Sequence, residues 1–169
     1  DELLNMAQAN IVEIAEQRIK PGFRPINQLT GPTLQQIRET AARKEAVTGI
    51  PSGFRYLDAM TAGFQPSELV ILAARPSMGK TAMGLNISHH VGIKTDKAVG
   101  FFSMEMSEAQ IVIRLLCAEA QIDIQKTRTG YLSDRDFEKL KLAGEALSRT
   151  RIFIDESAAL TIMEMKAKC

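Results

Sequence analysis

A glycine, a lysine and a threonine follow one another at Gly79-Lys80-Thr81, separated by four residues from an apolar run that ends at Ala74. Glycine lets the backbone approach a phosphate closely, and the N–H groups of a following helix then point at the negative charge. The lysine would reach the outer phosphates, and the threonine hydroxyl would ligate a magnesium ion. We therefore predict a nucleotide-binding loop made of Ala74, Arg75, Pro76, Ser77, Met78, Gly79, Lys80, Thr81 and Ala82.

The loop departs at one position from the pattern G-x-x-x-x-G-K-[ST], because Ala74 stands where the first glycine is usual. A Gly-Lys-Thr triplet can also occur by chance in a loop. Here an apolar strand pattern from Val70 comes before it and a helical pattern to about Ile93 follows, which is the context that the motif requires. The context favours the phosphate-binding loop.

A second candidate for chemistry is Glu105, which follows a predicted strand over Ala98–Met104. Active sites of parallel sheets gather at the carboxyl ends of strands. The next residues, Ser107 to Gln110, have the pattern of a helix capping box, which would fix the turn that carries Glu105. We predict that Glu105 polarises an attacking water. The alternative is a solvated loop acid whose replacement would change nothing.

Asp155-Glu156 ends a predicted strand over Arg151–Asp155 and imitates the magnesium-orienting aspartate and catalytic glutamate of many ATPases. The pattern alone leaves this interpretation and a structural one equally open. His89 and His90 are adjacent on the predicted helix, so their side chains point about 100° apart, which argues against one shared metal ion.

Strand patterns alternate with helical patterns, which predicts an α/β fold with a parallel sheet and helices on both faces. Three strands would make an incomplete sheet. Before it, residues 2–20 read as an amphipathic helix, a linker follows, and Pro32 is expected to open a helix that runs to about Ala46. The thin apolar stripe of that helix, Leu34, Ile37 and Ala41, suits either a solvated helix or one that docks on a neighbouring subunit.

The composition sets limits on partners. The chain has 169 residues, with 21 basic and 20 acidic side chains, so no global field draws it to DNA or to an acidic membrane. Its two cysteines have no metal-binding spacing, and no apolar run approaches the roughly 18 residues needed to span a bilayer. We expect a soluble cytoplasmic protein that contacts no membrane.

Over essentially its whole length the chain resembles the bacterial replicative DNA helicases of the DnaB family. Several independent motifs occur in the order and with the spacing of that family, in which alanine is frequent at the position of Ala74. The motifs are Thr48-Gly49-Ile50-Pro51-Ser52-Gly53-Phe54, the loop 73–81, Phe102-Ser103-Met104-Glu105-Met106-Ser107 and Arg114-Leu115-Leu116-Cys117-Ala118-Glu119.

The resemblance implies a RecA-like ATPase that uses ATP and Mg²⁺, assembles as a homo-hexamer and moves 5′ to 3′ along single-stranded DNA, with a primase and a helicase loader as partners. It implies that Lys80 and Thr81 contact the phosphates and magnesium, and that Glu105 activates water. It divides the chain into the end of an amino-terminal domain (1–20), a linker with a docking helix (21–47) and the first half of the ATPase domain (48–169).

In the family the magnesium-orienting aspartate, the main DNA-binding loops and the arginine finger lie beyond the position of Cys169. The resemblance therefore implies that this chain is a fragment with little activity of its own, and it disfavours a metal role for Asp155. Two alternatives share the motifs: a RecA-type recombinase or related circadian-type ATPase, and a nucleotide-gated assembly module that does no mechanical work.

Overall fold

We describe the protein from a computed structural model, which describes residues 23–157 and 159–169. The predicted helix over residues 2–20 lies outside this range. The chain divides into two compact units between Glu45 and Ala46. The second unit carries every residue of the predicted nucleotide site.

Within the first unit, helix α2 (Ile26–Arg43) begins after Pro25, whose backbone is extended, and Pro32 lies inside it. The prediction that the helix begins at Pro32 is therefore wrong. A proline inside a helix removes one hydrogen bond, here the one to the Gln28 carbonyl. None of the residues of α2 is buried, so water can satisfy that carbonyl and the helix continues through the proline.

The second unit starts with a loop that is closed on itself. An isolated antiparallel bridge joins Ile50 to Phe64, and the short helix α3 (Arg55–Thr61) lies between them. The buried Asp58 carboxylate accepts hydrogen bonds from the backbone N–H groups of Ser52 (2.7 Å) and Gly53 (3.2 Å). Burial raises the pKa of Asp58, but the hydrogen bonds together outweigh it, so the pKa lies below its usual value.

Two parallel strands form the sheet: β1 (Val99–Phe102) and β2 (Ile152–Asp155), with Val99 opposite Ile152 and Phe102 opposite Asp155. They confirm the two later strands that the sequence predicts. The connection between them runs through α5 (Glu108–Ala120), α6 (Ile124–Thr129) and α7 (Asp134–Ser148). A capping box starts α5 at Ser107, as predicted, and another starts α7 at Ser133.

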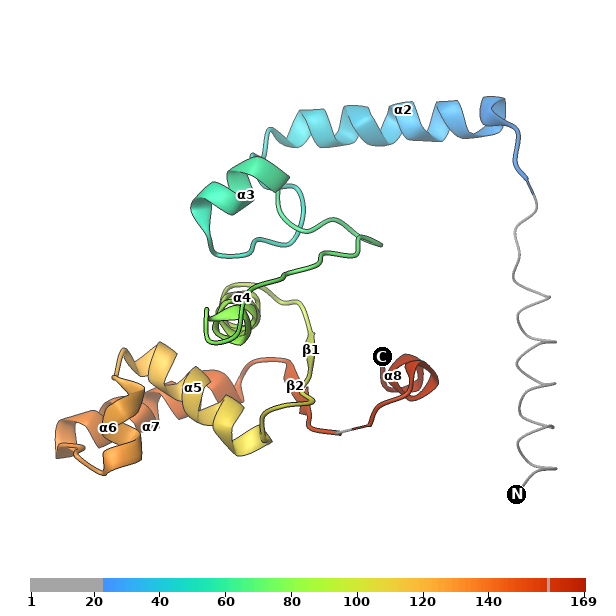
Figure 1. Cartoon of the computed structure of the whole chain (residues 1–169). Helices are drawn as coiled ribbons and strands as arrows, with labels where there is room; N and C mark the ends of the chain where they lie inside the picture. Colours follow the sequence, from blue (N-terminus) through green and yellow to red (C-terminus); the bar gives the residue numbers. More distant parts are fainter. Residues whose placement is uncertain (1–22, 158) are drawn as a thin grey trace, which may run out of the picture. The chain divides into compact units, whose positions relative to one another are not determined.

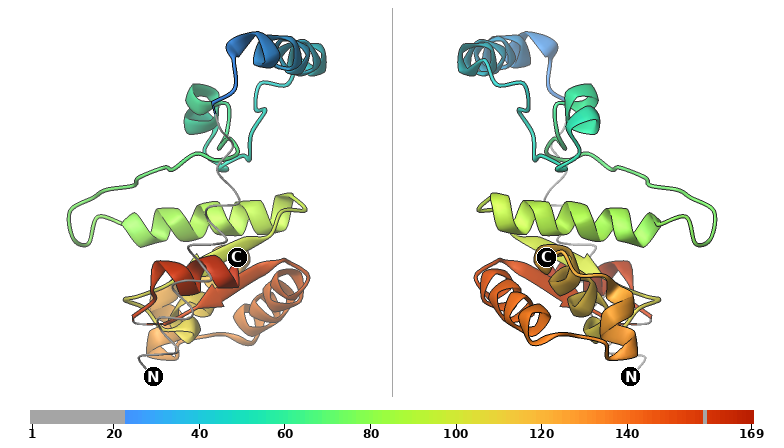
Figure 2. Two further views of the ribbon diagram at one scale, coloured as in Figure 1. Left: turned by 90° about the vertical axis from the view of Figure 1, so that its right-hand side faces the viewer. Right: turned by 90° about the vertical axis from the view of Figure 1, so that its left-hand side faces the viewer.

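The strand predicted from Val70 is absent from the described residues. Leu69 to Leu72 are instead exposed, with fractions of 86, 57, 80 and 41%, and Figure 2 shows an extended segment that leads into the N-terminus of α4 (Lys80–Lys94). A strand needs a neighbour that pairs with its backbone groups. Among the described residues, β1 and β2 pair with each other and the segment from Val70 pairs with neither. Its apolar pattern alone is therefore not enough to make it a strand.

Helices lie on both sides of the strand pair, as Figure 1 shows: α4, α5 and α7 on one side and α8 (Ile162–Lys168) on the other. The core is on the first side, where Leu85 of α4 and Ile111 and Leu115 of α5 are buried against Phe101 and Ile154 of the strands. This packing fixes α4 and α5 relative to the carboxyl ends of the strands.

Candidate functional site

The predicted nucleotide-binding loop and Glu105 meet at one cleft of about 470 Å³ beside the N-terminus of α4. Met78 is the exception among the predicted residues, because it does not line the cleft and its side chain is 73% exposed. A smaller neighbouring hollow again joins Lys80, Thr81 and Glu105. The larger cleft is lined by Ala74, Arg75, Pro76, Ser77, Gly79, Lys80, Thr81, Ala82, Glu105, Met106 and Arg114.

The loop curls because two of its residues adopt the left-handed conformation, Ser77 (φ 64°) and Gly79 (φ 85°). Glycine takes this conformation without the strain that other residues incur. Ala74 does not have a positive φ, so the turn does not require a glycine at the position where the common pattern has one.

The N-terminus of α4 faces this loop. Its first backbone hydrogen bond runs from Met83 N–H to the Gly79 carbonyl (2.9 Å). The N–H groups of Lys80, Thr81 and Ala82 precede that bond and have no acceptor within the helix. Together with the Lys80 ammonium they make this end of α4 suited to an anion such as a phosphate.

Glu105 lies in the short loop that joins β1 to α5, and this loop is held by several hydrogen bonds. The buried Ser103 donates its hydroxyl hydrogen to the Met106 carbonyl (2.7 Å) and accepts from Met106 N–H (3.1 Å). Ser103 N–H donates to the Asp155 carbonyl at the end of β2 (2.8 Å). The Glu105 carboxylate is therefore presented to the cleft by a braced loop.

Arg114 of α5 is a cleft residue that the sequence analysis assigned no role, although it appears there as part of a family motif. It brings a third cation to the cleft, in addition to Arg75 and Lys80. One feature of the sequence could have identified Arg114 as a site residue. It is a lone arginine among the apolar residues of α5, three positions after the buried Ile111 and next to the buried Leu115. A charge at that place on an amphipathic helix indicates a function other than core packing.

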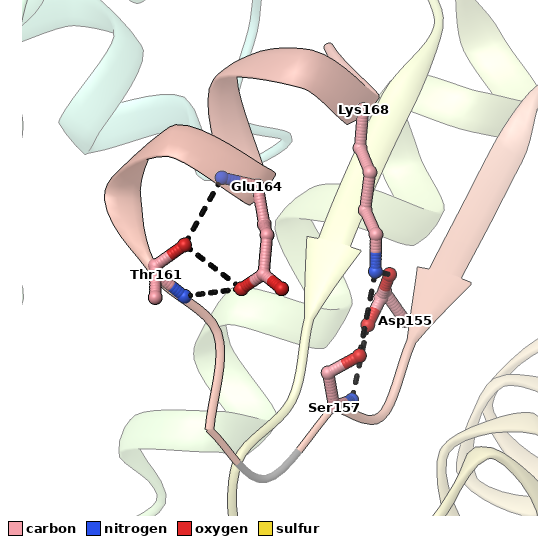
Figure 3. Close-up of polar contacts among 5 residues, drawn as sticks. All are labelled: Asp155, Ser157, Thr161, Glu164 and Lys168. Carbon is pink, nitrogen blue, oxygen red and sulfur yellow. Dashed lines mark hydrogen bonds and ion pairs between the residues drawn. The ribbon is translucent and has the colours of Figure 1, made fainter. Parts of the chain in front are cut away.

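Asp155 and Glu156 both have structural partners outside the cleft lining. Lys168 of α8 pairs with the Asp155 carboxylate, and Ser157 N–H donates to it (3.0 Å), as Figure 3 shows. Lys168, followed by Ser157, lowers the pKa of Asp155 to about 2. Glu156 accepts a hydrogen bond from the backbone N–H of Glu108 (2.7 Å), the first residue of α5. This arrangement agrees with the structural interpretation of the pair.

The two histidines of α4 have separate surroundings. His89 Nε2 lies 2.7 Å from a carboxylate oxygen of Glu119 on α5. The ring of His90 packs against Gly53, where a β-carbon would come within 2.5 Å of the imidazole. Both side chains thus attach α4 to its neighbours.

A magnesium ion fits the donor set of the cleft. Among the described residues no group of three or more His, Cys, Asp or Glu side chains could hold a metal ion. Magnesium bound with a nucleotide needs no such group, since it takes most of its ligands from water and phosphate oxygens. The Thr81 hydroxyl at the cleft is a suitable protein ligand for such an ion.

Comparison with known proteins gives a consistent result. The family described as the DnaB-like helicase C terminal domain matches residues 49–169. The replicative DNA helicase DnaC of Bacillus subtilis is 44% identical and the replicative DNA helicase DnaB of Geobacillus stearothermophilus is 43% identical, both over the whole chain. The chain spans 37% of the length of each of these relatives.

Solved structures agree with this result. A structure of a DnaB-like replicative helicase and its interactions with primase aligns with a TM-score of 0.74 at 29% identity, covering 96% of this chain and 38% of that one. A solved ATPase domain aligns with a TM-score of 0.75 at 31% identity, covering 83% of this chain and 50% of that one. No helix in the part of the chain that the structure describes is long and apolar enough to cross a bilayer.

Proposed function

The chain belongs to the DnaB-like helicase family, and from that premise we propose that residues 48–169 are the ATP-binding part of a replicative DNA helicase motor. The observation that carries this proposal is that Lys80, Thr81 and Glu105 line the same cleft. A cation, a helix N-terminus and a carboxylate in one cleft are what binding and hydrolysis of a nucleoside triphosphate require.

Binding rests on the loop and the start of α4. The N–H groups of Lys80, Thr81 and Ala82 and the Lys80 ammonium would hold the phosphates, while Arg75 to Gly79 would wrap around them. The Thr81 hydroxyl would hold Mg²⁺, which supplies charge neutralisation for the phosphates when bound. Arg114, together with Arg75, would add positive charge to the lining of the cleft.

Hydrolysis is assigned to Glu105. Its carboxylate would accept a proton from water as the water attacks the terminal phosphate, so a positioned base takes the place of bulk solvent. Support comes from the place of Glu105 on the cleft beside Lys80 and Thr81, and from the hydrogen bonds that brace its loop.

The complete motor would use this hydrolysis to move 5′ to 3′ along single-stranded DNA as a homo-hexameric ring. The chain covers 37% of the length of its relatives, so we place the main DNA-binding loops in the remaining part of such a protein. The proposed site of action is the cytoplasm, with a helicase loader and a primase as partners. A related helicase whose solved structure includes its interactions with primase supports the last of these.

The direct test of the nucleotide site is Lys80→Ala in the full-length protein. Loss of the one ammonium at the start of α4 should lower the affinity for ATP or abolish its hydrolysis, because the charge-assisted contact with the phosphates is lost. Nucleotide affinity would be measured by calorimetry, and hydrolysis by magnesium-dependent phosphate release.

The matched control is Lys94→Ala, which removes a lysine from the last turn of the same helix, at the end away from the cleft. The control should bind and hydrolyse ATP as the wild type does. Wild-type affinity together with a wild-type hydrolysis rate in Lys80→Ala would rule out the assignment.

A further inference from the structure

The loop that carries Glu105 is attached to the second strand at both of its ends. At the β1 end, Ser103 N–H donates to the backbone carbonyl of Asp155 (2.8 Å). At the α5 end, the N–H of Glu108 donates to the Glu156 carboxylate (2.7 Å). The last residue of β2 and the residue after it therefore hold the two sides of this loop, and the contact from Glu108 to Glu156 spans 48 positions of the chain.

These two attachments differ in their chemistry. The Ser103 bond continues the backbone pairing of β1 with β2 and depends on no side chain of β2. The Glu108 bond depends entirely on the Glu156 side chain. A carboxylate that accepts a hydrogen bond from the N–H at a helix N-terminus forms a charge-assisted bond. Its negative charge also interacts favourably with the positive end of the helix dipole.

We propose that Glu156 is a positioning residue for Glu105: its carboxylate anchors the first turn of α5 and so fixes the loop from Ser103 to Ser107 in the cleft. This inference rests on the proposed function of Glu105. A general base must lie within hydrogen-bond reach of the water that it activates, and a displacement of about 1 Å can cost on the order of 10²-fold in rate.

The test compares Glu156→Ala with Glu156→Gln in the full-length protein, measuring kcat for ATP hydrolysis and the affinity for ATP separately. Alanine removes the acceptor, so kcat should fall by roughly 10- to 100-fold while the affinity stays within about twofold. Glutamine keeps an oxygen that accepts from Glu108 N–H, so it should restore kcat to within about threefold of wild type.

Two results would overturn the proposal. Wild-type kcat in Glu156→Ala would show that the anchor does not affect catalysis. A Glu156→Gln variant as slow as Glu156→Ala would show that the negative charge of Glu156 is needed, which is the behaviour of a reacting or metal-orienting carboxylate rather than of an anchor.

Glu164→Ala is the matched control for lost helix capping. The Glu164 carboxylate accepts from Thr161 N–H (2.8 Å) at the start of α8, an equally exposed contact that is outside the cleft lining (Figure 3). The Glu164→Ala variant should have the kcat of the wild type. If its kcat falls as much as that of Glu156→Ala, the effect comes from general destabilisation and the proposal is overturned.

The Glu105→Gln variant distinguishes failure of the proposed catalytic role of Glu105 from failure of the positioning role of Glu156. A fast Glu105→Gln variant refutes the proposed role of Glu105. A slow Glu105→Gln variant beside a fast Glu156→Ala variant refutes the positioning role alone.

Discussion

Asp155 shows how an ion pair and a local hydrogen bond shift the pKa of a carboxylate. Lys168 pairs with it, Ser157 donates to it, and both favour its charged form. The folded-state pKa of about 2 lies below the unfolded value of about 3.9. The pair therefore contributes stability above pH ~3.9, and this contribution is lost as the pH falls through about 2. Solvent screens the exposed pair, so we expect the contribution to be small.

Lys168→Ala should raise the pKa of Asp155 toward 3.9, because the largest cause of the shift is removed. The chemical shift of the Asp155 carboxyl carbon, followed by NMR against pH, gives this value directly. The control is Lys166→Ala, which removes a lysine of α8 for which the structure gives no ion pair with Asp155. An Asp155 that titrates near 3.9 in the wild type would contradict the ion pair.

The site residues that the sequence predicted are those defined by local patterns. Lys80 and Thr81 belong to a loop motif that opens a helix, and Glu105 lies between an apolar run and a capping box, so a few consecutive residues are enough to identify them. The roles of Arg114 and Glu156 depend on contacts between distant segments, such as the one from Glu156 to Glu108 across 48 positions. A pattern within one segment carries no information about such a partner.

At the scale of elements, the sequence predictions that were wrong concern a strand and a helix start, and both depend on contacts that the local sequence does not show. The strand pattern from Val70 expresses a preference for extended backbone, but a strand forms only where another strand pairs with it. The start of α2 was placed at Pro32 because proline favours the first turn, but the helix begins at Ile26, directly after Pro25, and continues through Pro32. The start of α5 depends on a local cap at Ser107 and was predicted correctly.

Helix α2 provides the prediction at this scale. Leu34 and Ile37 are 59% and 57% exposed, and no residue of α2 is buried, so its apolar stripe contributes little to folding. We propose that the stripe docks on a neighbouring subunit. The double variant Leu34→Lys and Ile37→Lys should then weaken assembly of the full-length protein more than it lowers thermal stability, which sedimentation at low concentration would measure.

The control for α2 is the double variant Gln35→Lys and Gln36→Lys, which adds the same charge on other sides of the helix. It should assemble as the wild type does. A ring of Leu34→Lys and Ile37→Lys that is as stable as the wild-type ring would rule out docking through this stripe.

At the scale of the whole molecule, the hydrophobic core of the second unit positions the elements that line the candidate nucleotide site. The packing of Leu85, Ile111 and Leu115 sets α4 and α5 against the strands, so that the N-terminus of α4 and the loop before α5 line one cleft. The chain carries 21 basic and 20 acidic residues, so net charge cannot by itself hold DNA. We propose binding and hydrolysis of ATP as the function of this unit.

The most direct test of this account is the rate of magnesium-dependent phosphate release from ATP by the full-length Glu105→Gln variant, measured beside its affinity for ATP. Glutamine keeps the shape of the side chain but cannot act as a general base. We predict unchanged affinity and a rate lower by roughly 10² to 10⁴. A variant that releases phosphate at the wild-type rate would contradict the assignment of Glu105, and with it the proposed chemistry of the cleft.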